Sequence, residues 1–338
     1  MLTIRENFNL TKLNTFGVEA KAKYFVRVNS EEEVKELINN SSYKNNRVFI
    51  LGSGSNILFT KDFDGLIISS AIKGISVKEE TEDYIFLKVG SGENWHHLVM
   101  YCVERNWGGI ENLSLIPGQV GGAPFQNIGA YGLEVSDVIE EVNSIDLDTS
   151  GSVIFSNQQC QFAYRNSIFK KNNKYFITSV TFKLTKKNHS LQTDYKSLKE
   201  YMVTNKISTP TIKNISDAVI AIRRQKLVDP NEFGNAGSFF TNPIVSSQQL
   251  MRLKKEYPTI QYHNIDNEAV KIFAGWLIEQ CGWKGKQINN VGVNKNQALV
   301  ILNLGNATGE DILDFSQKIK SDVFKKFQIQ LESEVTIL

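Results

Sequence analysis

The chain has 338 residues, a length that favours two or three domains over one. Its 38 lysines and arginines against 36 aspartates and glutamates argue against both a polybasic nucleic-acid-binding arm and an acidic tail. No apolar run approaches the ~20 residues that span a bilayer, and the first residues lack the apolar core of a signal peptide. We therefore expect a cytoplasmic protein without membrane or nucleic-acid partners.

Cysteine and histidine are too few and too scattered to predict a metal site. The chain has three cysteines, Cys102, Cys160 and Cys281, and no CxxC motif. An odd number of widely separated cysteines favours free thiols in a reducing compartment. The adjacent His96 and His97 would point about 100° apart on a helix and could not share a metal ion. We expect neither a disulfide framework nor a metal.

The first 190 residues predict alternating strands and helices. Ser30, followed by Glu33, predicts a capping box that opens a helix. The segment 107–132 is too rich in glycine for regular structure, although it carries several apolar residues. The other elements predicted here are strands at 48–51, 57–59, 66–68 and 175–184, a helix at 94–105 and a turn at 146–151.

Helices dominate the sequence from about residue 213 onward. The last of them begins after Thr308, its predicted N-cap, and has a regular apolar stripe. The final segment, 327–338, alternates as a strand, with Glu332 and Glu334 on the face opposite its apolar residues. The predicted helices are 216–227, 247–256, 268–281 and 309–326.

Glycine is concentrated in one stretch, since 13 of the 23 glycines fall between Gly52 and Gly132. The first cluster, GSGSN at 52–56, follows a predicted buried strand, and successive N–H groups at such a turn can bind an anion. No Lys-Ser or Lys-Thr follows, so it is not a Walker loop, and Ile57 occupies the third glycine position of a Rossmann fingerprint. A plain hairpin turn explains this cluster equally well.

The second cluster, at 116–132, reads IPGQVGGAPFQNIGAYG. Glycine and proline interleaved with apolar residues suit a rigid loop around a flat, phosphate-bearing ligand, and equally a buried connecting loop. Together with NTFG at 14–17 and LGSGSN at 51–56, this segment resembles the UDP-N-acetylenolpyruvoylglucosamine reductase (MurB) family of bacterial cell-wall synthesis. The resemblance continues to the end of the chain through YRNSIF (164–169), GNAGSFF (234–240), AGWLI (274–278) and LESEV (331–335).

The resemblance implies an α+β protein. It has a two-subdomain FAD-binding fold of the vanillyl-alcohol oxidase (PCMH) type and a C-terminal α/β substrate-binding domain. The implied boundaries are 1–70 for FAD-binding subdomain 1, to which the strand 327–338 returns, 71–212 for subdomain 2, and 213–326 for the substrate-binding domain. Tyr195, in TDYKSL, matches the subclass with a substrate-capping tyrosine loop.

The resemblance also implies the reaction, in which NADPH reduces the enolpyruvyl ether of UDP-N-acetylglucosamine to UDP-N-acetylmuramate through non-covalently bound FAD. No second dinucleotide motif is visible for NADPH, so NADPH and the UDP-sugar are expected to use one pocket in turn, in a ping-pong scheme. A monomer is expected because no unpartnered apolar stripe is evident.

Adding hydride to the β-carbon of an unsaturated carboxylate builds negative charge on the α-carbon and the carboxylate. Arg165 matches the cation at that carboxylate, because a guanidinium binds carboxylates through a planar fork. Glu334, if protonated, matches a second donor to the developing enolate, and Ser238 matches the acid that protonates the α-carbon. Without the resemblance, these residues would be a surface ion pair, a solvated charge and a serine in a structural turn.

The resemblance carries ligand-binding roles to further positions. Two departures lie beside such positions, because Val228 and Ser333 stand where proline is expected, and they leave the local geometry there open. The positions that match the UDP-sugar site are Tyr195, Lys226, Asn242 and Gln297. The positions that match the FAD site are Gly52, Ser53, Gly54, Ser55, Asn56, Pro117, Gly118, Gly121, Gly122, Asn127, Gly129, Ala130, Tyr131 and Arg223.

Two other functions remain open at this point. One is a flavin-dependent oxidase of the same fold, although many such oxidases tether the flavin to a histidine and the glycine-rich loop contains none. The other is a UDP-sugar-binding protein without redox activity. A purified protein that is colourless and releases no flavin would exclude both redox functions.

Overall fold

The structure is a computed structural model that describes residues 2–338. Two compact units share the chain, and each combines segments that are distant in sequence. The first consists of the residues up to Phe8, Ala22–Ser53 and Asp64–Arg223, and the second of Asn9–Lys21, Gly54–Phe63 and Arg224–Leu338. Among the described residues, no helix has both the length and the apolar character of a membrane span.

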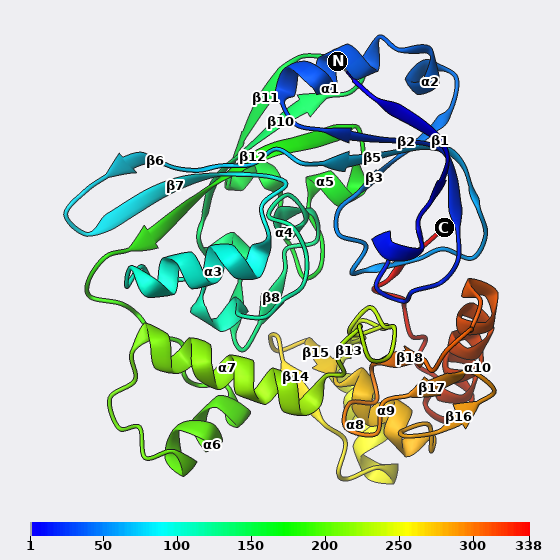
Figure 1. Ribbon diagram of the computed structural model, residues 1–338. Helices are drawn as coiled ribbons and strands as arrows, with labels where there is room; N and C mark the ends of the chain where they lie inside the picture. The colour runs from blue at the N-terminus through cyan, green and yellow to red at the C-terminus, as the bar shows by residue number, and fades with distance from the viewer. Residues whose placement is uncertain (1) are drawn as a thin grey trace. The chain divides into compact units, whose positions relative to one another are not determined.

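The first unit contains a four-stranded sheet whose strands, in spatial order, are β1 (Ile4–Asn9), β2 (Lys21–Val28), β5 (Phe63–Ser70) and β3 (Arg47–Leu51). Alternate residues of β2, such as Val26 and Val28, belong to one apolar core with Leu37 of a covering helix. The helices at this sheet are α1 (Glu31–Ile38) and α2 (Ser41–Lys44) (Figure 1). The strands predicted at 48–51 and 66–68 are confirmed within β3 and β5.

Both predicted helix caps are present, with one difference. Thr308 caps α10 (Gly309–Phe327) and forms a reciprocal capping box with Asp311. Ser30 accepts a hydrogen bond from the N–H of Glu33 at 3.3 Å, but the Glu33 carboxylate accepts from the N–H of Asn29 at 2.7 Å instead of from Ser30. The capping box predicted for α1 is therefore only half formed, because the residue before the cap takes the carboxylate.

A second sheet in this unit is antiparallel and has the order β11 (Ser152–Ser156), β10 (Ile139–Asp146), β12 (Tyr175–Thr185), β7 (Tyr84–Gly90) and β6 (Ile75–Glu80). The strand predicted at 175–184 is confirmed as β12, and the helix predicted at 94–105 is confirmed as α3 (Trp95–Glu104). α3 runs along one face of the sheet (Figure 1), where Trp95 and Leu98 share its core. The short elements near it are η2 (Glu111–Leu113), α4 (Gly122–Phe125), β8 (Gly129–Ala130), β9 (Leu133–Glu134), η3 (Val135–Asp137), η4 (Gln158–Cys160) and α5 (Ile168–Lys171).

Asp146, the last residue of β10, organises the turn predicted at 146–151. Its Oδ1 accepts hydrogen bonds from the N–H groups of Asp148 at 2.9 Å and Thr149 at 3.2 Å, and its Oδ2 lies 2.8 Å from Nζ of Lys174. Burial raises the pKa of this carboxyl, but the bonds from Lys174 and the two amides outweigh burial. The pKa of Asp146 is therefore lower than its ordinary value.

Asp146→Asn is expected to lower the free energy of unfolding at pH 7 by about 1–3 kcal/mol, because an amide cannot form the charge-assisted bond to Lys174. A carboxyl with a lowered pKa in the folded state stabilises the fold above its unfolded pKa, and the contribution disappears as pH falls through the folded pKa. Urea titrations should therefore show the difference at neutral pH and a smaller one in acid. Asp148→Asn, at an exposed carboxylate 3.8 Å from Lys174, is the control, and an equal effect of both substitutions would contradict the assignment.

Two helices follow along the chain, and the second one ends beyond Arg223, with its last three residues in the second unit. α6 (Lys196–Thr204) and α7 (Ile212–Lys226) share a small core that includes Leu198, Ile215 and Val219. The helix predicted at 216–227 is confirmed as α7, although α7 begins four residues earlier, at Ile212.

The second unit carries two three-stranded sheets, ordered β13 (Ile244–Ser246), β15 (Ala269–Ile272), β14 (Tyr262–Asn264), and β16 (Gln287–Ile288), β17 (Val291–Val293), β18 (Ile301–Asn303). The helix predicted at 247–256 is confirmed as α8 (Ser247–Glu256). The helix predicted at 268–281 is wrong in its first part, where β15 precedes α9 (Ala274–Gln280). Val270 and Ile272 are buried while their neighbours in β15 are less so, which is the two-residue period of a strand.

The end of the chain differs from the strand predicted at 327–338. Phe327 continues the apolar stripe of Ile319 and Val323 at four-residue spacing, so it is the last residue of α10, and Gln328 ends the helix with a φ of 54°. The regular strand is only β19 (Thr336–Ile337), which pairs in parallel with β4 (Ile57–Leu58). The other short element of this unit is η1 (Thr11–Leu13).

Candidate functional site

The loop that follows β3 requires glycine at position 54. A Cβ on Gly54 would lie 1.9 Å from the carbonyl oxygen of Leu13, and its φ of +69° lies in the left-handed region. The N–H of Thr15 donates to the carbonyl of Gly54 at 3.0 Å. The NTFG and LGSGSN motifs therefore meet through their backbones, which explains the glycine at position 54.

Gly54→Ala is expected to lower the free energy of unfolding by at least about 2 kcal/mol, because the new Cβ meets a carbonyl oxygen and the φ is unfavourable for alanine. Denaturant unfolding measures the change. Gly17→Ala is the matched control, since Gly17 has a similar φ of +65° with no atom within 4 Å of the added Cβ. Equal losses in the two variants would mean that crowding at Gly54 is unimportant.

The second glycine-rich segment lies against residues 91–93. The N–H of Val120 donates to the carbonyl of Glu93, and the N–H of Gly121 donates to the carbonyl of Ser91, both at 2.9 Å. A Cβ on Gly121 would lie 2.7 Å from the Cβ of Ser91. Glycine thus allows a close approach of two loops here.

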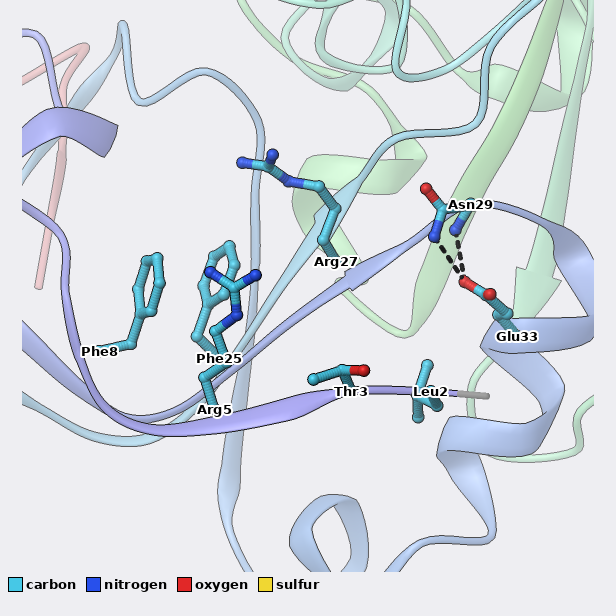
Figure 2. A pocket seen from close by; sticks show the side chains of 8 residues that line it. All are labelled: Leu2, Thr3, Arg5, Phe8, Phe25, Arg27, Asn29 and Glu33. Atoms are coloured by element: carbon cyan, nitrogen blue, oxygen red, sulfur yellow. Dashed lines mark hydrogen bonds between the residues drawn. The ribbon is translucent and has the colours of Figure 1, made fainter.

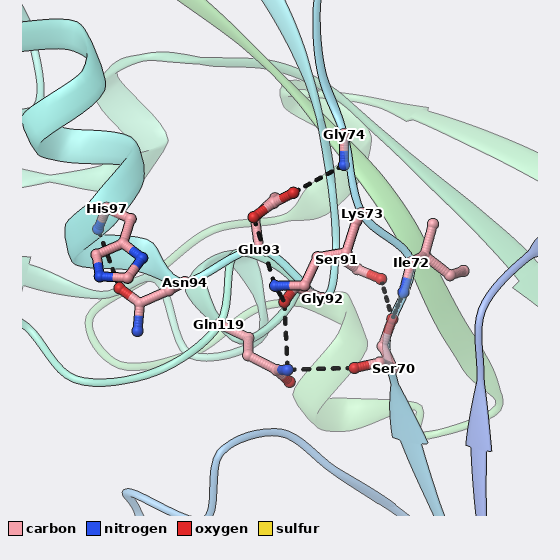
Figure 3. A network of polar contacts seen from close by, with 10 residues as sticks. All are labelled: Ser70, Ile72, Lys73, Gly74, Ser91, Gly92, Glu93, Asn94, His97 and Gln119. Carbon is pink, nitrogen blue, oxygen red and sulfur yellow. Dashed lines mark hydrogen bonds and ion pairs between the residues drawn. The ribbon is translucent and has the colours of Figure 1, made fainter.

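Gln119, within the same segment, joins two further loops and was not among the predicted site residues. Its Nε2 donates to the carbonyl of Ser70 at 3.1 Å and to that of Gly92 at 3.4 Å (Figure 3). The hydroxyls of Ser70 and Ser91 are 2.7 Å apart, and a Cβ on Gly52 would lie 3.8 Å from Oε1 of Gln119. These contacts bring together segments from four parts of the sequence, and the one sequence signal for Gln119 is its position in the IPGQVGG motif.

Asn127 is buried, and its side chain is held by the protein. Its Nδ2 donates to Oε2 of Glu134 at 2.8 Å and to the carbonyl of Ala163 at 3.3 Å, and its Oδ1 accepts from the N–H of Ser136 at 3.1 Å. Asn127 and Tyr131 both have positive φ angles, 45° and 50°. A cofactor-binding role for Asn127 would therefore act through its backbone.

Arg165 occupies a left-handed backbone conformation, which glycine adopts more readily than arginine. Ala163 and Asn166 exchange two backbone hydrogen bonds of 3.0 Å, so Tyr164 and Arg165 form the tip of a tight turn, and Arg165 has a φ of 52°. Its Nη2 donates to the carbonyl of Gly129 at 2.8 Å and its Nη1 to that of Asn127 at 3.4 Å. An arginine kept in a left-handed turn, and directed at the glycine-rich loop, points to a role in function.

Tyr131, Tyr195 and Arg223 form a second group in the first unit. The rings of Tyr131 and Tyr195 meet edge to face with centroids 5.2 Å apart, and Tyr195 is 49% exposed. Burial raises the pKa of Tyr131, and burial lowers the pKa of Arg223. The Nε of Arg223 is buried and has no hydrogen-bond partner among the described residues, so this donor is available to a ligand.

Ser238 and Glu334 lie on adjacent extended segments of the second unit. The N–H of Phe239 donates to the carbonyl of Leu299 at 2.8 Å, and the N–H of Glu334 donates to the carbonyl of Phe239 at 2.9 Å. The segment that contains Ser238 is thus bonded on one side to residues near 300 and on the other to the LESEV motif. Both side chains are half-buried, whereas Glu332 is exposed, as predicted for a solvated charge.

The other three predicted substrate-binding residues also belong to the second unit. Oδ1 of Asn242 accepts from the N–H of Ala274 at 2.9 Å, at the start of α9. Oε1 of Gln297 would lie 3.2 Å from a Cβ on Gly275, so Gln297 and the AGWLI motif are also close. The carbonyl of Lys226 accepts from Nδ2 of Asn294 at 3.1 Å, which ties the end of α7 to the same region.

Val228 and Ser333, which stand where prolines were expected, lie in segments whose backbone groups form hydrogen bonds. The carbonyl of Val228 accepts a hydrogen bond from Nδ2 of Asn235 at 3.1 Å. Ser333 lies opposite Phe240 in a bridge flanked by the bonds from Glu334 to Phe239 and from Thr241 to Glu332. In this non-hydrogen-bonded antiparallel pair, the N–H of Ser333 donates no bond to the Phe240 segment. A proline, which has no N–H, would therefore fit the same geometry.

The residues present fit a bound FAD. An added Cβ at Gly122 would have no atom within 4 Å, so the backbone there is open to a ligand. Arg223 offers a buried donor that has no hydrogen-bond partner among the described residues. Within residues 2–338, no three His, Cys, Asp or Glu side chains are grouped in a way that could hold a metal ion.

Comparisons with known proteins agree with these features. A FAD-binding domain model matches residues 22–154, and the model of the UDP-N-acetylenolpyruvoylglucosamine reductase C-terminal domain matches residues 229–338. UDP-N-acetylenolpyruvoylglucosamine reductase of Flavobacterium johnsoniae is 47% identical over 339 residues, and that of Amoebophilus asiaticus is also 47% identical, with full coverage of both chains in each case. The crystal structure of the reductase MurB from Thermus caldophilus superposes with a TM-score of 0.69 at 22% identity, covering 100% of this chain and 98% of that one.

The fold and the two matched domains define a flavoprotein oxidoreductase with a FAD-binding domain and a dedicated C-terminal domain. At 47% identity over its full length, the chain belongs to the UDP-N-acetylenolpyruvoylglucosamine reductase family. The family resemblance and the fold class predicted from the sequence are thereby confirmed.

Proposed function

We propose that this protein reduces UDP-N-acetylglucosamine enolpyruvate to UDP-N-acetylmuramate with NADPH and bound FAD, as a cytoplasmic step of peptidoglycan precursor synthesis that supports cell shape and division. Membership in the reductase family supports this proposal. The observation that carries it is Arg165, a permanently charged residue held at a turn position that favours glycine. Glycine would suit the turn alone better than arginine.

The chain's own residues would divide the work as follows. Bound FAD would supply the hydride transfer between NADPH and the β-carbon of the substrate. Arg165 neutralises the substrate carboxylate through its planar fork. Glu334 in its protonated form would donate a hydrogen bond where enolate charge develops, and Ser238 would give its hydroxyl proton to the α-carbon.

Binding roles follow from the same family positions. Tyr195 would cap the UDP-sugar, with Lys226, Asn242 and Gln297 as further contacts. The glycine-rich loops and Arg223 would hold FAD without a covalent bond, with Nε of Arg223 as a donor to it. The division into 1–70 with 327–338, 71–212 and 213–326 also remains a proposal, as does a monomeric state.

NADPH oxidation that depends on UDP-N-acetylglucosamine enolpyruvate is the test of this function. We expect a yellow protein whose flavin is released by acid, and NADPH oxidation only when the UDP-sugar is added. Inhibition at high UDP-sugar concentration should accompany ping-pong use of one pocket. Flavin that stays on the polypeptide would favour an oxidase, and a colourless protein that binds the UDP-sugar would favour a non-redox binding protein.

A further inference from the structure

A cavity in the first unit, apart from the loops described above, is lined by arginines from two strands. It has a volume of about 260 Å³ and lies beside β1 and β2. Figure 2 shows Arg5 from β1 and Arg27 from β2 among the side chains around it. The remaining lining residues are Leu2, Thr3, Phe8, Phe25, Asn29 and Glu33.

Neither arginine has an acidic partner among the residues that the structure describes. Arg5 and Arg27 form no hydrogen bond or ion pair with any residue of the described range 2–338. Each guanidinium carbon instead lies over an aromatic ring, 5.7 Å from the centroid of Phe8 for Arg5 and 5.9 Å from that of Phe25 for Arg27. The two rings stack with centroids 4.1 Å apart, so they support both cations at neighbouring positions.

Glu33 is the one acidic residue of the lining, and its carboxylate is directed at Asn29. Oε2 accepts from the backbone N–H of Asn29 at 2.7 Å and from its Nδ2 at 3.0 Å. These two bonds hold the pKa of Glu33 below its ordinary value. Glu33 therefore stays charged without pairing with either arginine, and the two arginines against one carboxylate leave the cavity with a net positive charge.

We propose that this cavity binds the phosphate groups of a small phosphorylated molecule through Arg5 and Arg27 together. Guanidinium forks match phosphate oxygens, and two forks on neighbouring strands favour a polyvalent anion over a single carboxylate. The volume lies just below that of pockets for drug-sized ligands, so it suits a diphosphate-sized group. None of the lining residues belongs to the proposed FAD or UDP-sugar positions.

Titration calorimetry with inorganic pyrophosphate, on the full chain saturated with FAD, tests this proposal. Bound FAD prevents pyrophosphate from binding at the glycine-rich FAD segments. We expect wild-type protein to bind pyrophosphate at millimolar concentration or tighter, less tightly at high salt. Arg5→Gln and Arg27→Gln should each weaken binding about tenfold, because each removes a charge-assisted contact. Inorganic phosphate should bind more weakly than pyrophosphate if both arginines act on one ligand.

Arg105→Gln is the matched control. Arg105 also lies over an aromatic ring, 3.6 Å from the centroid of Tyr101, but it is paired with Glu104 at 4.0 Å. This variant should bind pyrophosphate as the wild type does. Arg5→Lys with Arg27→Lys retains the charge and the fold, and should bind with intermediate affinity. Absence of binding in the wild type, or equal affinity in the Arg5→Gln, Arg27→Gln and control proteins, would overturn the proposal.

Discussion

Ser238→Ala is expected to leave flavin reduction by NADPH nearly unchanged and to reduce turnover of the UDP-sugar by about 100- to 10,000-fold, the range of a lost general acid. The fold should tolerate the change. The Oγ of Ser238 forms no hydrogen bond with any residue that the structure describes, and its segment is held by backbone bonds of Phe239. Only a proton donor to the substrate would therefore be lost.

Stopped-flow measurement of the two half-reactions separates this role from a structural one. Ser333→Ala is the matched control, because Ser333 lies in the neighbouring extended segment and its Oγ is also without a hydrogen bond among the described residues. It should leave both half-reactions intact. If Ser238→Ala slowed flavin reduction as much as turnover, Ser238 would act in binding or folding rather than as an acid.

The elements predicted correctly are those whose signals are local. α10 has a complete apolar stripe and a clear start at Thr308, and α8 begins at the N-cap Ser246. β12 is an apolar run that is buried along most of its length. The helix predicted at 268–281 failed because four residues of β15 precede α9, and a strand that short is hard to distinguish from a helix turn. The strand predicted at 327–338 failed because Phe327 fits both an alternating pattern and the stripe of α10.

The candidate site was predictable mainly through the family motifs. Ser238 and Glu334 are nearly 100 residues apart, and their segments are joined by backbone bonds that no side-chain pattern records. The contacts of Gln119 are likewise with carbonyls of distant loops, at Ser70 and Gly92. Local sequence encodes turns and helix faces, whereas these contacts depend on how distant loops are brought together.

The backbone conformation of Arg165 is a further feature that the sequence did not predict. Its φ of 52° is a feature that sequence would assign to glycine or asparagine, so the turn itself was not predicted at this residue. Glycine would be the better residue for this turn alone, so the observed conformation suggests that arginine is present for its function.

Arg165→Lys is therefore expected to reduce kcat/KM by about 100-fold or more, corresponding to roughly 2.7 kcal/mol of transition-state stabilisation. Lysine keeps the charge, but a single ammonium lacks the fork that spans the carbonyls of Gly129 and Asn127 and binds a carboxylate with two parallel bonds. Steady-state kinetics at varied UDP-sugar concentration measure the loss. Near wild-type activity of this variant would contradict the role of Arg165 as the carboxylate clamp.

Arg165→Gly provides the control for stability. Relief of the left-handed conformation gains about 1–2 kcal/mol, while the extra chain flexibility of glycine and the lost bonds to Gly129 and Asn127 offset much of it. Thermal unfolding should therefore place this variant near the wild type, although its activity is lost. A protein that is stable, binds FAD and fails to turn over would show that arginine is kept at this turn for the substrate and not for the fold.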